Sequence, residues 1–189
     1  MPFELRTARL VLRSWRPQDE GPFAVMNADA EVMEFFPAAL DPSQSDALVE
    51  RFRLTERIHG FCPWAAERRD TGAFIGFVGL APLPDDLPCS PGTEVGWRLA
   101  RDGWGHGFAT EGATAVLAHA FGEMGFDEIV SMTAARNVRS RRVMERVGMH
   151  CDPRDDFAHP RIADGDDLKP HVLYRLTVGD WAAARAAGG

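Results

Sequence analysis

Several residue types that define other protein classes are scarce in this chain. Its three cysteines, Cys62, Cys89 and Cys151, stand at unrelated spacings, so we expect neither a disulfide framework nor a metal site. No apolar run approaches the roughly 18 residues that a membrane span needs. Charged residues interrupt the apolar residues near the N-terminus, where a secretory signal would be unbroken. We therefore expect a cytoplasmic protein without a membrane partner.

Positive charge is also scarce, and it is almost entirely arginine. Lys169 is the single lysine among 21 basic residues, and 28 acidic residues bring the net charge to -7. A general nucleic-acid binder needs a basic face, so we expect no nucleic-acid partner. The 189 residues are 45% hydrophobic and 26% charged. These values are typical of one globular domain and exclude extended disorder.

Strand and helix patterns alternate along the chain and predict a mixed α/β domain. Turn residues 69–72 separate two strand-like runs and predict an antiparallel hairpin, and the proline-rich residues 82–91 predict a loop. Ser43 or Ser45 is expected to cap the second helix. The predicted strands are residues 9–13, 64–67, 74–80, 94–99, 128–133 and 172–176, with a further one near 149–151. The predicted helices lie around residues 23–26, 43–58, 113–121 and 137–148.

A glycine-rich turn between a strand and an amphipathic helix is the most informative segment. Gly103, Gly105 and Gly107 expose backbone N–H groups just before a helix, whose N-terminus carries a partial positive charge. This pattern predicts a phosphate or pyrophosphate site, although an ordinary strand-to-helix turn is the alternative. The dinucleotide fingerprint fails at Thr110, and no Gly-Lys-Ser/Thr of a nucleotide triphosphatase follows. A nucleotide-binding oxidoreductase is therefore disfavoured.

The same turn resembles the acyl-CoA pyrophosphate loop of the GNAT superfamily of N-acyltransferases, whose pattern is Gln/Arg-x-x-Gly-x-Gly/Ala. Gly107 and Ala109 match this pattern, and Trp104 replaces its first residue. A Trp followed by Gly-x-Gly-aromatic-Ala-Thr-Glu is similar to the RimJ/RimL branch, which acetylates ribosomal-protein N-termini. Residues 137–149 resemble the Asn-x-x-Ser-x-x-Val-x-x-x-x-Gly-Met helix of that branch. The resemblance covers residues 8–177, the expected N-acetyltransferase domain, and leaves residues 178–189 as a C-terminal tail.

The resemblance implies a GNAT-like mixed, mostly antiparallel central sheet flanked by helices and splayed between two central strands, near residues 94–99 and 128–133. It implies acetyl-CoA as co-substrate, no metal, and an amine acceptor that is a small molecule or a protein N-terminus. A monomer or a homodimer is expected. A CoA-binding module without catalysis is the alternative class, but it would tolerate the loss of Glu94 and Ser140, which are both present.

The resemblance also assigns residue roles. Glu94 is the expected base, acting through water, and the alternative is that its side chain simply faces solvent. Ser140 is expected to protonate the leaving thiolate, and the alternative is that a serine is merely tolerated in the first turn of a helix. Backbone N–H groups of residues 96–99 would stabilise the developing oxyanion. Asn137 is expected both to cap its helix and to contact pantetheine. The expected cofactor-binding residues are Trp97, Leu99, Trp104, Gly105, His106, Gly107, Phe108, Ala109, Thr110, Asn137 and Arg142.

Two charged segments agree with this interpretation. Residues 136–146 contain five arginines and one glutamate, a basic helix that favours a phosphorylated ligand, although a solvated helix face is the alternative. Residues 152–169 contain six aspartates against three basic residues, a charge of -3. Such a segment would attract a cationic acceptor. Tyr174 is expected in the core or at the wall of a cleft.

Overall fold

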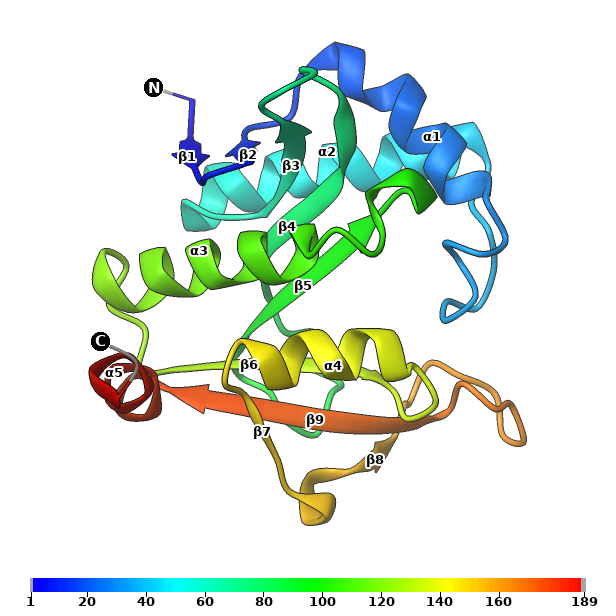
Figure 1. Cartoon of the computed structure of the whole chain (residues 1–189). Coiled ribbons are helices and arrows are strands. Elements are labelled where there is room, and N and C mark those ends of the chain that lie inside the picture. Colours follow the sequence, from blue (N-terminus) through cyan, green and yellow to red (C-terminus); the bar gives the residue numbers. More distant parts are fainter. Residues whose placement is uncertain (1, 188–189) are drawn as a thin grey trace. The chain divides into compact units, whose positions relative to one another are not determined.

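The computed structural model describes residues 2–187, and the chain forms two compact units (Figure 1). The first unit comprises residues up to 81 and residues 96–116, and the second comprises residues 82–95 and those from 117 onward. Strand β5 (Thr93–Leu99) and helix α3 (Phe108–Gly122) run through both units.

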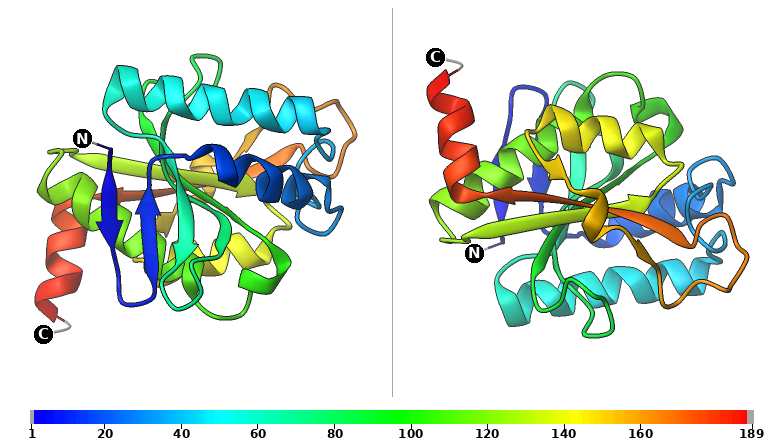
Figure 2. Two further views of the ribbon diagram at one scale, coloured as in Figure 1. Left: turned by 90° about the horizontal axis from the view of Figure 1, so that it is seen from above. Right: turned by 90° about the horizontal axis from the view of Figure 1, so that it is seen from below.

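The first unit is built on strands in the order β1-β2-β3-β4-β5, and β1 to β4 pair antiparallel. Their bounds are β1 (Glu4–Arg6), β2 (Leu10–Arg13), β3 (Pro63–Arg68) and β4 (Phe74–Pro82). Helices α1 (Glu20–Ala28) and α2 (Pro42–His59) cover one face, and the first part of α3 covers the other (Figure 2). Short 3-10 helices precede α1 (Pro17–Asp19) and follow β5 (Arg101–Gly103).

Helix α2 begins at a different cap from the one expected. Neither Ser43 nor Ser45 caps it, because Asp41 accepts from the backbone of Gln44 at 2.8 Å, and the Gln44 side chain accepts from Asp41 at 2.9 Å. Pro42 then occupies the first turn, where its missing N–H costs nothing. Ser45 is fully buried and accepts a hydrogen bond from Asn27 instead.

Aromatic side chains form the core between these strands and α1 and α2. The ring centroids of Phe23 and Phe77 lie 6.2 Å apart, and those of Phe52 and Phe77 lie 5.3 Å apart. The next residue of β4, Val78, faces α3, because a Cβ added to Gly112 of α3 would lie 3.0 Å from the Val78 side chain. Successive residues 77 and 78 thus mark the two faces of the strand.

The second unit contains strands in the order β5-β6-β9-β7, with β8 also paired to β9. Strands β5 and β6 pair in parallel through one register pair, Glu94 opposite Val130, whereas β6 and β9 pair antiparallel along their lengths. Leu83, Leu87 and Leu173 pack with Val130 in a small core. The bounds are β6 (Glu128–Ala134), α4 (Val138–Arg146), β7 (His150–Cys151), a 3-10 helix (Pro153–Asp155), β8 (Phe157–Ala158), β9 (Pro170–Thr177) and α5 (Val178–Ala187).

The mixed α/β class and the mostly antiparallel strand pairing are as expected. The sequence patterns missed β1 and β8, because strands of three and two residues are too short to show alternation. They also missed α5, which lies in the segment expected as a tail. Most of the segment expected as a tail forms α5, and Trp181 packs with its ring centroid 5.8 Å from that of Phe121. The proposed boundary at residue 177 stays a prediction. None of the helices within residues 2–187 combines the length and apolarity of a membrane span.

Candidate active site

The glycine-rich turn after β5 presents backbone donors at the start of a helix. Gly105 and Gly107 have φ of 78° and 79°, a left-handed conformation that favours glycine. Both are exposed, and within residues 2–187 the N–H groups of Gly105, His106 and Gly107 have no acceptor. Helix α3 begins directly afterwards, so its N-terminal amides add to the same positive field. The turn therefore has the backbone donors that an anion site requires.

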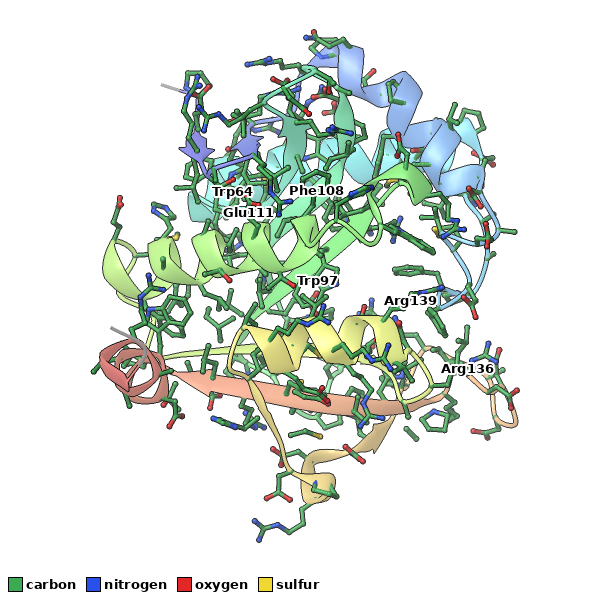
Figure 3. All side chains as sticks on the ribbon, viewed as in Figure 1. Trp64, Trp97, Phe108, Glu111, Arg136 and Arg139 are labelled. Atoms are coloured by element: carbon green, nitrogen blue, oxygen red, sulfur yellow. The ribbon has the colours of Figure 1, made fainter. Side chains whose placement is uncertain are left out.

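A carboxylate clamps this turn to the hairpin of β1 and β2. Glu111, in the first turn of α3, accepts from the Thr7 hydroxyl at 2.6 Å, the Arg9 backbone at 2.8 Å and Arg9 Nε at 2.6 Å (Figure 3). Arg9 also donates to the carbonyl of His106 at 2.9 Å. Burial opposes ionisation of Glu111, but the hydrogen bonds from Thr7 and Arg9 outweigh it and lower its pKa. The carboxylate thus holds the turn in place.

Two arginines lie over the ring of Phe108 in the same unit. The guanidinium of Arg9 is 4.8 Å from the ring centroid and that of Arg68 is 5.6 Å. Phe108 itself is buried, so it meets a ligand at this turn only through its backbone. The indole of Trp104 donates to the carbonyl of Leu99 at 2.7 Å, which ties the turn back to β5.

The predicted turn residues all belong to the first unit, but only some of them are exposed. The expectation for Gly103 is wrong, because this residue is buried and its N–H donates to the carbonyl of Ala100 at 2.9 Å. His106 is exposed, and Ala109 and Thr110 are half-buried in the first turn of α3. In β5, Trp97 is half-buried and Leu99 is buried.

Glu94 lies in the second unit, at the single register pair between β5 and β6. Its side chain is half-buried, and burial raises the pKa of its carboxyl to about 7. Burial is the cause of this shift, and no cation within residues 2–187 contributes to it. A carboxyl that titrates near neutral pH can accept a proton at one moment and release it at the next.

Asn137 and Ser140 share a hydrogen-bond network at the start of α4. Asn137 caps the helix by accepting from the Ser140 backbone at 3.2 Å, as expected. Its amide donates to the Thr133 hydroxyl at 2.9 Å and to the Ser140 hydroxyl at 3.2 Å. Because the Ser140 oxygen accepts this bond, its own proton is left to point elsewhere. The hydroxyl is thus oriented to donate.

Tyr174 lies in the core of the second unit, where its hydroxyl is already engaged. Its ring is 2% exposed, its hydroxyl donates to Glu145 at 3.0 Å, and it accepts from Arg141 at 3.3 Å. Burial is the largest cause that raises its pKa. Arg142, predicted to bind the cofactor, is exposed on α4.

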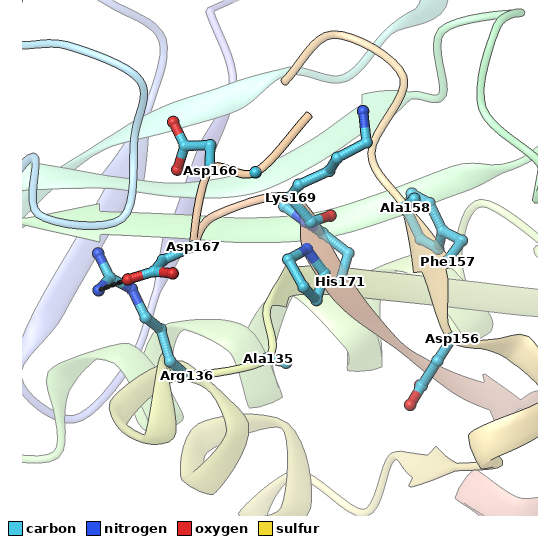
Figure 4. Close-up of a pocket in the computed structure, with 11 residues that line it drawn as sticks. Ala135, Arg136, Asp156, Phe157, Ala158, Asp166, Asp167, Lys169 and His171 are labelled. Atoms are coloured by element: carbon cyan, nitrogen blue, oxygen red, sulfur yellow. Dashed lines mark hydrogen bonds and ion pairs between the residues drawn. The ribbon is translucent and has the colours of Figure 1, made fainter. Parts of the chain in front are cut away.

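A pocket of about 740 Å³ opens beside β8, β9 and the acidic segment (Figure 4). Asp156, Asp166 and Asp167 contribute carboxylates to its lining. Asp167 lies 3.7 Å from Arg136, whereas Asp156 and Asp166 have no ion pair within residues 2–187. Arg136 and Lys169 line the same pocket, so its wall carries charges of both signs.

Histidine rings lie at this pocket, but they do not form a metal site. His171 lines the pocket, and its ring centroid is 4.7 Å from that of His159. Burial is the largest cause that lowers the pKa of each ring, which favours the neutral form. Within residues 2–187 no group of three potential metal ligands converges.

Sequence reasoning missed the roles of Arg9, Glu111 and Thr133. Glu111 and Arg9 were visible only as parts of the glycine-turn motif and the opening strand, and their 102-residue separation hides the contact. The sequence patterns did not single out Arg98 of β5 either.

Similarity to known proteins agrees with this geometry. Residues 9–150 match the family described as acetyltransferase (GNAT) domain. The FsC-acetyl coenzyme A-N(2)-transacetylase of Aspergillus fumigatus is 30% identical over 188 residues, covering 94% of this chain and 77% of that protein.

Solved structures show the same fold. A GNAT-family acetyltransferase from Bacillus anthracis superposes with a TM-score of 0.78 at 20% identity, covering 94% of this chain and 99% of that one. The ribosomal L7/L12 alpha-N-protein acetyltransferase RimL superposes with a TM-score of 0.77 at 13% identity, covering 94% and 95%. The chain belongs to the GNAT acetyltransferase family, whose members transfer an acetyl group from acetyl-CoA to an amine nitrogen.

Proposed function

We propose that the protein acetylates a primary amine by direct attack within a ternary complex with acetyl-CoA. The observation that carries this proposal is the half-buried Glu94, whose pKa is raised to about 7. An α-amino group has a pKa of about 8 and must lose a proton before it can attack a carbonyl. A carboxylate with a pKa near neutrality accepts that proton more readily than an ordinary one, directly or through water.

Acetyl-CoA supplies the acyl thioester. The turn from Trp104 to Thr110 would hold its pyrophosphate through backbone N–H groups, and Asn137 and Arg142 would contact the rest of the molecule. Backbone N–H groups of residues 96–99 would face the negative charge that develops on the carbonyl oxygen.

Ser140 then donates its proton to the departing sulfur and recovers one from solvent. The hydrogen bond that its oxygen accepts from Asn137 supports this role, because it orients the hydroxyl proton away from the amide. Tyr174 is a poorer donor, since its proton is already directed at Glu145. No covalent acyl-enzyme is needed, and the cysteines take no part.

Two classes of acceptor fit this reaction: a protein N-terminus, which the RimJ/RimL-like motif favours, and a small-molecule amine. The Aspergillus relative is named for N(2) acetylation, and RimL for a protein terminus. We propose a cytoplasmic enzyme that acts as a monomer or homodimer.

A thiol-release assay with acetyl-CoA against a panel of amines tests the proposal. The panel should contain amino acids, polyamines, aminoglycosides and short peptides. Release of CoA thiol that requires an amine, and that Glu94→Gln reduces, is the expected result. Tight acetyl-CoA binding with no release for any amine would instead favour a CoA-binding module without catalysis.

A further inference from the structure

Arg98 of β5 is a half-buried cation that pairs with no anion within residues 2–187. Its Nη1 donates to the side-chain oxygen of Asn27 at 2.7 Å, and its guanidinium lies 4.0 Å from the ring centroid of Phe36 and 5.5 Å from that of Phe77. Its Nε is buried and has no acceptor, and no carboxylate within residues 2–187 pairs with it. Burial lowers the pKa of Arg98 to about 10, so the group is still protonated at pH 7.

This arrangement is costly for a purely structural residue. A guanidinium that leaves water loses favourable hydration, and an anion or a full set of hydrogen bonds normally offsets that loss. Within residues 2–187 the guanidinium of Arg98 makes one hydrogen bond, although the group has five N–H donors. A leucine or methionine would pack against Phe36 and Phe77 without the penalty. An anion from outside the chain would offset this cost.

A buried network already holds the guanidinium in position. Asn27 of α1 is fully buried, and its amide donates to the hydroxyl of Ser45 in α2 at 2.8 Å. This bond turns the Asn27 oxygen toward Arg98. Because both polar partners are buried, the orientation of the guanidinium is set before any ligand binds. The rings of Phe36 and Phe77 pack against the guanidinium, so an anion would meet it at its edge, where the N–H groups point.

The position of Arg98 separates it from the predicted phosphate site. Phe77 contacts Arg98 and also packs against Phe23 and Phe52, so this side of the strands is the side covered by α1 and α2. Helix α3, which the glycine-rich turn opens, packs on the opposite face at Val78. Arg98 and the expected pyrophosphate site therefore lie on different faces of the first unit. The anion that Arg98 binds is accordingly not the pyrophosphate of CoA.

We infer that Arg98 binds a carboxylate of the acceptor, which is therefore an amino-carboxylate such as an amino acid or a short peptide. The planar fork of an arginine matches the two oxygens of a carboxylate and can hold them with two parallel hydrogen bonds. This inference rests on the proposed amine acetylation, and it adds a second recognition group to the acceptor besides its amine. A polyamine has no group that Arg98 could bind.

Matched acceptors test this directly. The probes are L-amino acids and dipeptides, each compared with its own C-terminal carboxamide, which keeps the amine and the shape but removes the negative charge. We expect wild-type kcat/KM to favour the carboxylate by about tenfold or more, since charge-assisted hydrogen bonds are the strong ones. Arg98→Met should abolish this preference, and Arg98→Lys should retain part of it because it keeps the charge but loses the fork.

Two controls separate this role from a general effect on the fold. Arg57→Met removes an exposed arginine from α2 and should leave the preference unchanged. Acetyl-CoA affinity, measured by calorimetry, should be the same in all variants. If Arg98→Met does not fold, Arg98→Lys alone decides, because a structural role would lower the rates with carboxylate and carboxamide equally.

Three results would overturn the inference: equal constants for carboxylate and carboxamide in the wild type, an equal loss for both in the variants, or weaker acetyl-CoA binding in Arg98→Met. Failure of the proposed function looks different, because no amine would then release thiol. In that case calorimetry in the presence of CoA measures the affinity for each carboxylate and its carboxamide, and this comparison tests the role of Arg98. Carboxylate-selective binding that Arg98→Met removes would support its role, and unselective or absent binding would refute it.

Discussion

The carboxylate of Glu111 accepts hydrogen bonds from both the backbone and the side chain of Arg9, at 2.8 and 2.6 Å, across 102 residues of sequence. The same arginine holds the carbonyl of His106 in the glycine-rich turn. This contact links the shape of a predicted phosphate site to the hairpin of β1 and β2. It is therefore the first target for mutation.

Glu111→Gln should loosen the turn and destabilise the protein. The Glu111 side chain is 17% exposed and that of Arg9 51%, so solvent screening limits the expected loss to about 1 kcal/mol of unfolding free energy. Acetyl-CoA affinity should fall as well. Urea denaturation and calorimetry measure the two effects, and Glu4→Gln, which breaks the exposed pair with Arg6, serves as control. Unchanged values in Glu111→Gln would show that the clamp does not support the turn.

The same carboxylate predicts a pH dependence. Because the folded-state pKa of Glu111 is lowered, its contribution is present above its unfolded pKa and is lost as the pH falls through the folded value. The stability difference between wild type and Glu111→Gln should therefore shrink below about pH 4. A difference that stays constant into the acid range would contradict the ion pair as its source.

Gly107→Val should weaken acetyl-CoA binding. The left-handed backbone at residue 107 and its exposed N–H are what a close approach to phosphate requires, and a β-branched side chain opposes both. We expect a loss of about tenfold or more, which corresponds to about 1.4 kcal/mol per decade. Gly72→Val imposes the same kind of backbone strain in the β3–β4 turn and controls for it. Wild-type CoA affinity in a folded Gly107→Val protein would refute the assignment of the turn.

Glu94→Gln should lower kcat by about 10² to 10⁴, the usual loss for a general base. In the wild type the rate should rise with pH through the Glu94 pKa of about 7, and the variant should lack this acidic limb. Acetyl-CoA affinity should stay unchanged. A variant that keeps full turnover with the same profile would show that binding the two substrates together is sufficient.

The raised pKa of Glu94 predicts that the free energy of unfolding changes with pH in the opposite direction to the change expected for Glu111. Because its folded-state pKa is raised, the unfolded chain releases this proton first, so stability falls as the pH rises from about 4.3 to about 7. Glu94→Gln should remove this fall and be more stable above pH 7 by on the order of 2 kcal/mol. Denaturation at pH 5 and pH 8 measures it, and parallel curves for both proteins would contradict the raised pKa.

Ser140→Ala should slow the step in which the thiolate leaves. A loss of about 10² or more in kcat, with CoA binding kept, is expected if the hydroxyl is the acid. Ser140→Thr keeps the hydroxyl and should restore part of the rate. An equally inactive Thr variant would indicate that Ser140 matters through its packing on α4.

Asp156→Asn combined with Asp166→Asn should raise KM for a cationic acceptor and reduce its dependence on salt. These two carboxylates line the pocket beside β8 and β9 and have no ion pair within residues 2–187. Their field reaches about one Debye length, or roughly 8 Å at physiological salt. Specificity constants for peptides with basic and acidic second residues, at low and high salt, give the answer. Salt-independent constants in the wild type would show that the acidic segment is only solvated.

The sequence alone determined the features that depend on neighbouring residues. The glycine-rich turn, the Asn137 cap and the amphipathic part of α3 were all predictable, because backbone propensity and capping act within a few residues. The same local rules were compatible with more than one N-cap residue for α2. The choice of Asp41 over Ser43 and Ser45 depended on where the chain approaches α1, since Ser45 is needed inside to orient Asn27.

Tertiary structure alone decided which distant residues meet. Arg98 has no unusual neighbours in the sequence, and its missing anion becomes evident only when Asn27, Phe36 and Phe77 surround it. The raised pKa of Glu94 likewise comes from burial, which local sequence does not specify. The physical reason is that desolvation and charge pairing depend on every group packed around a site, and packing brings those groups together from separate strands and helices.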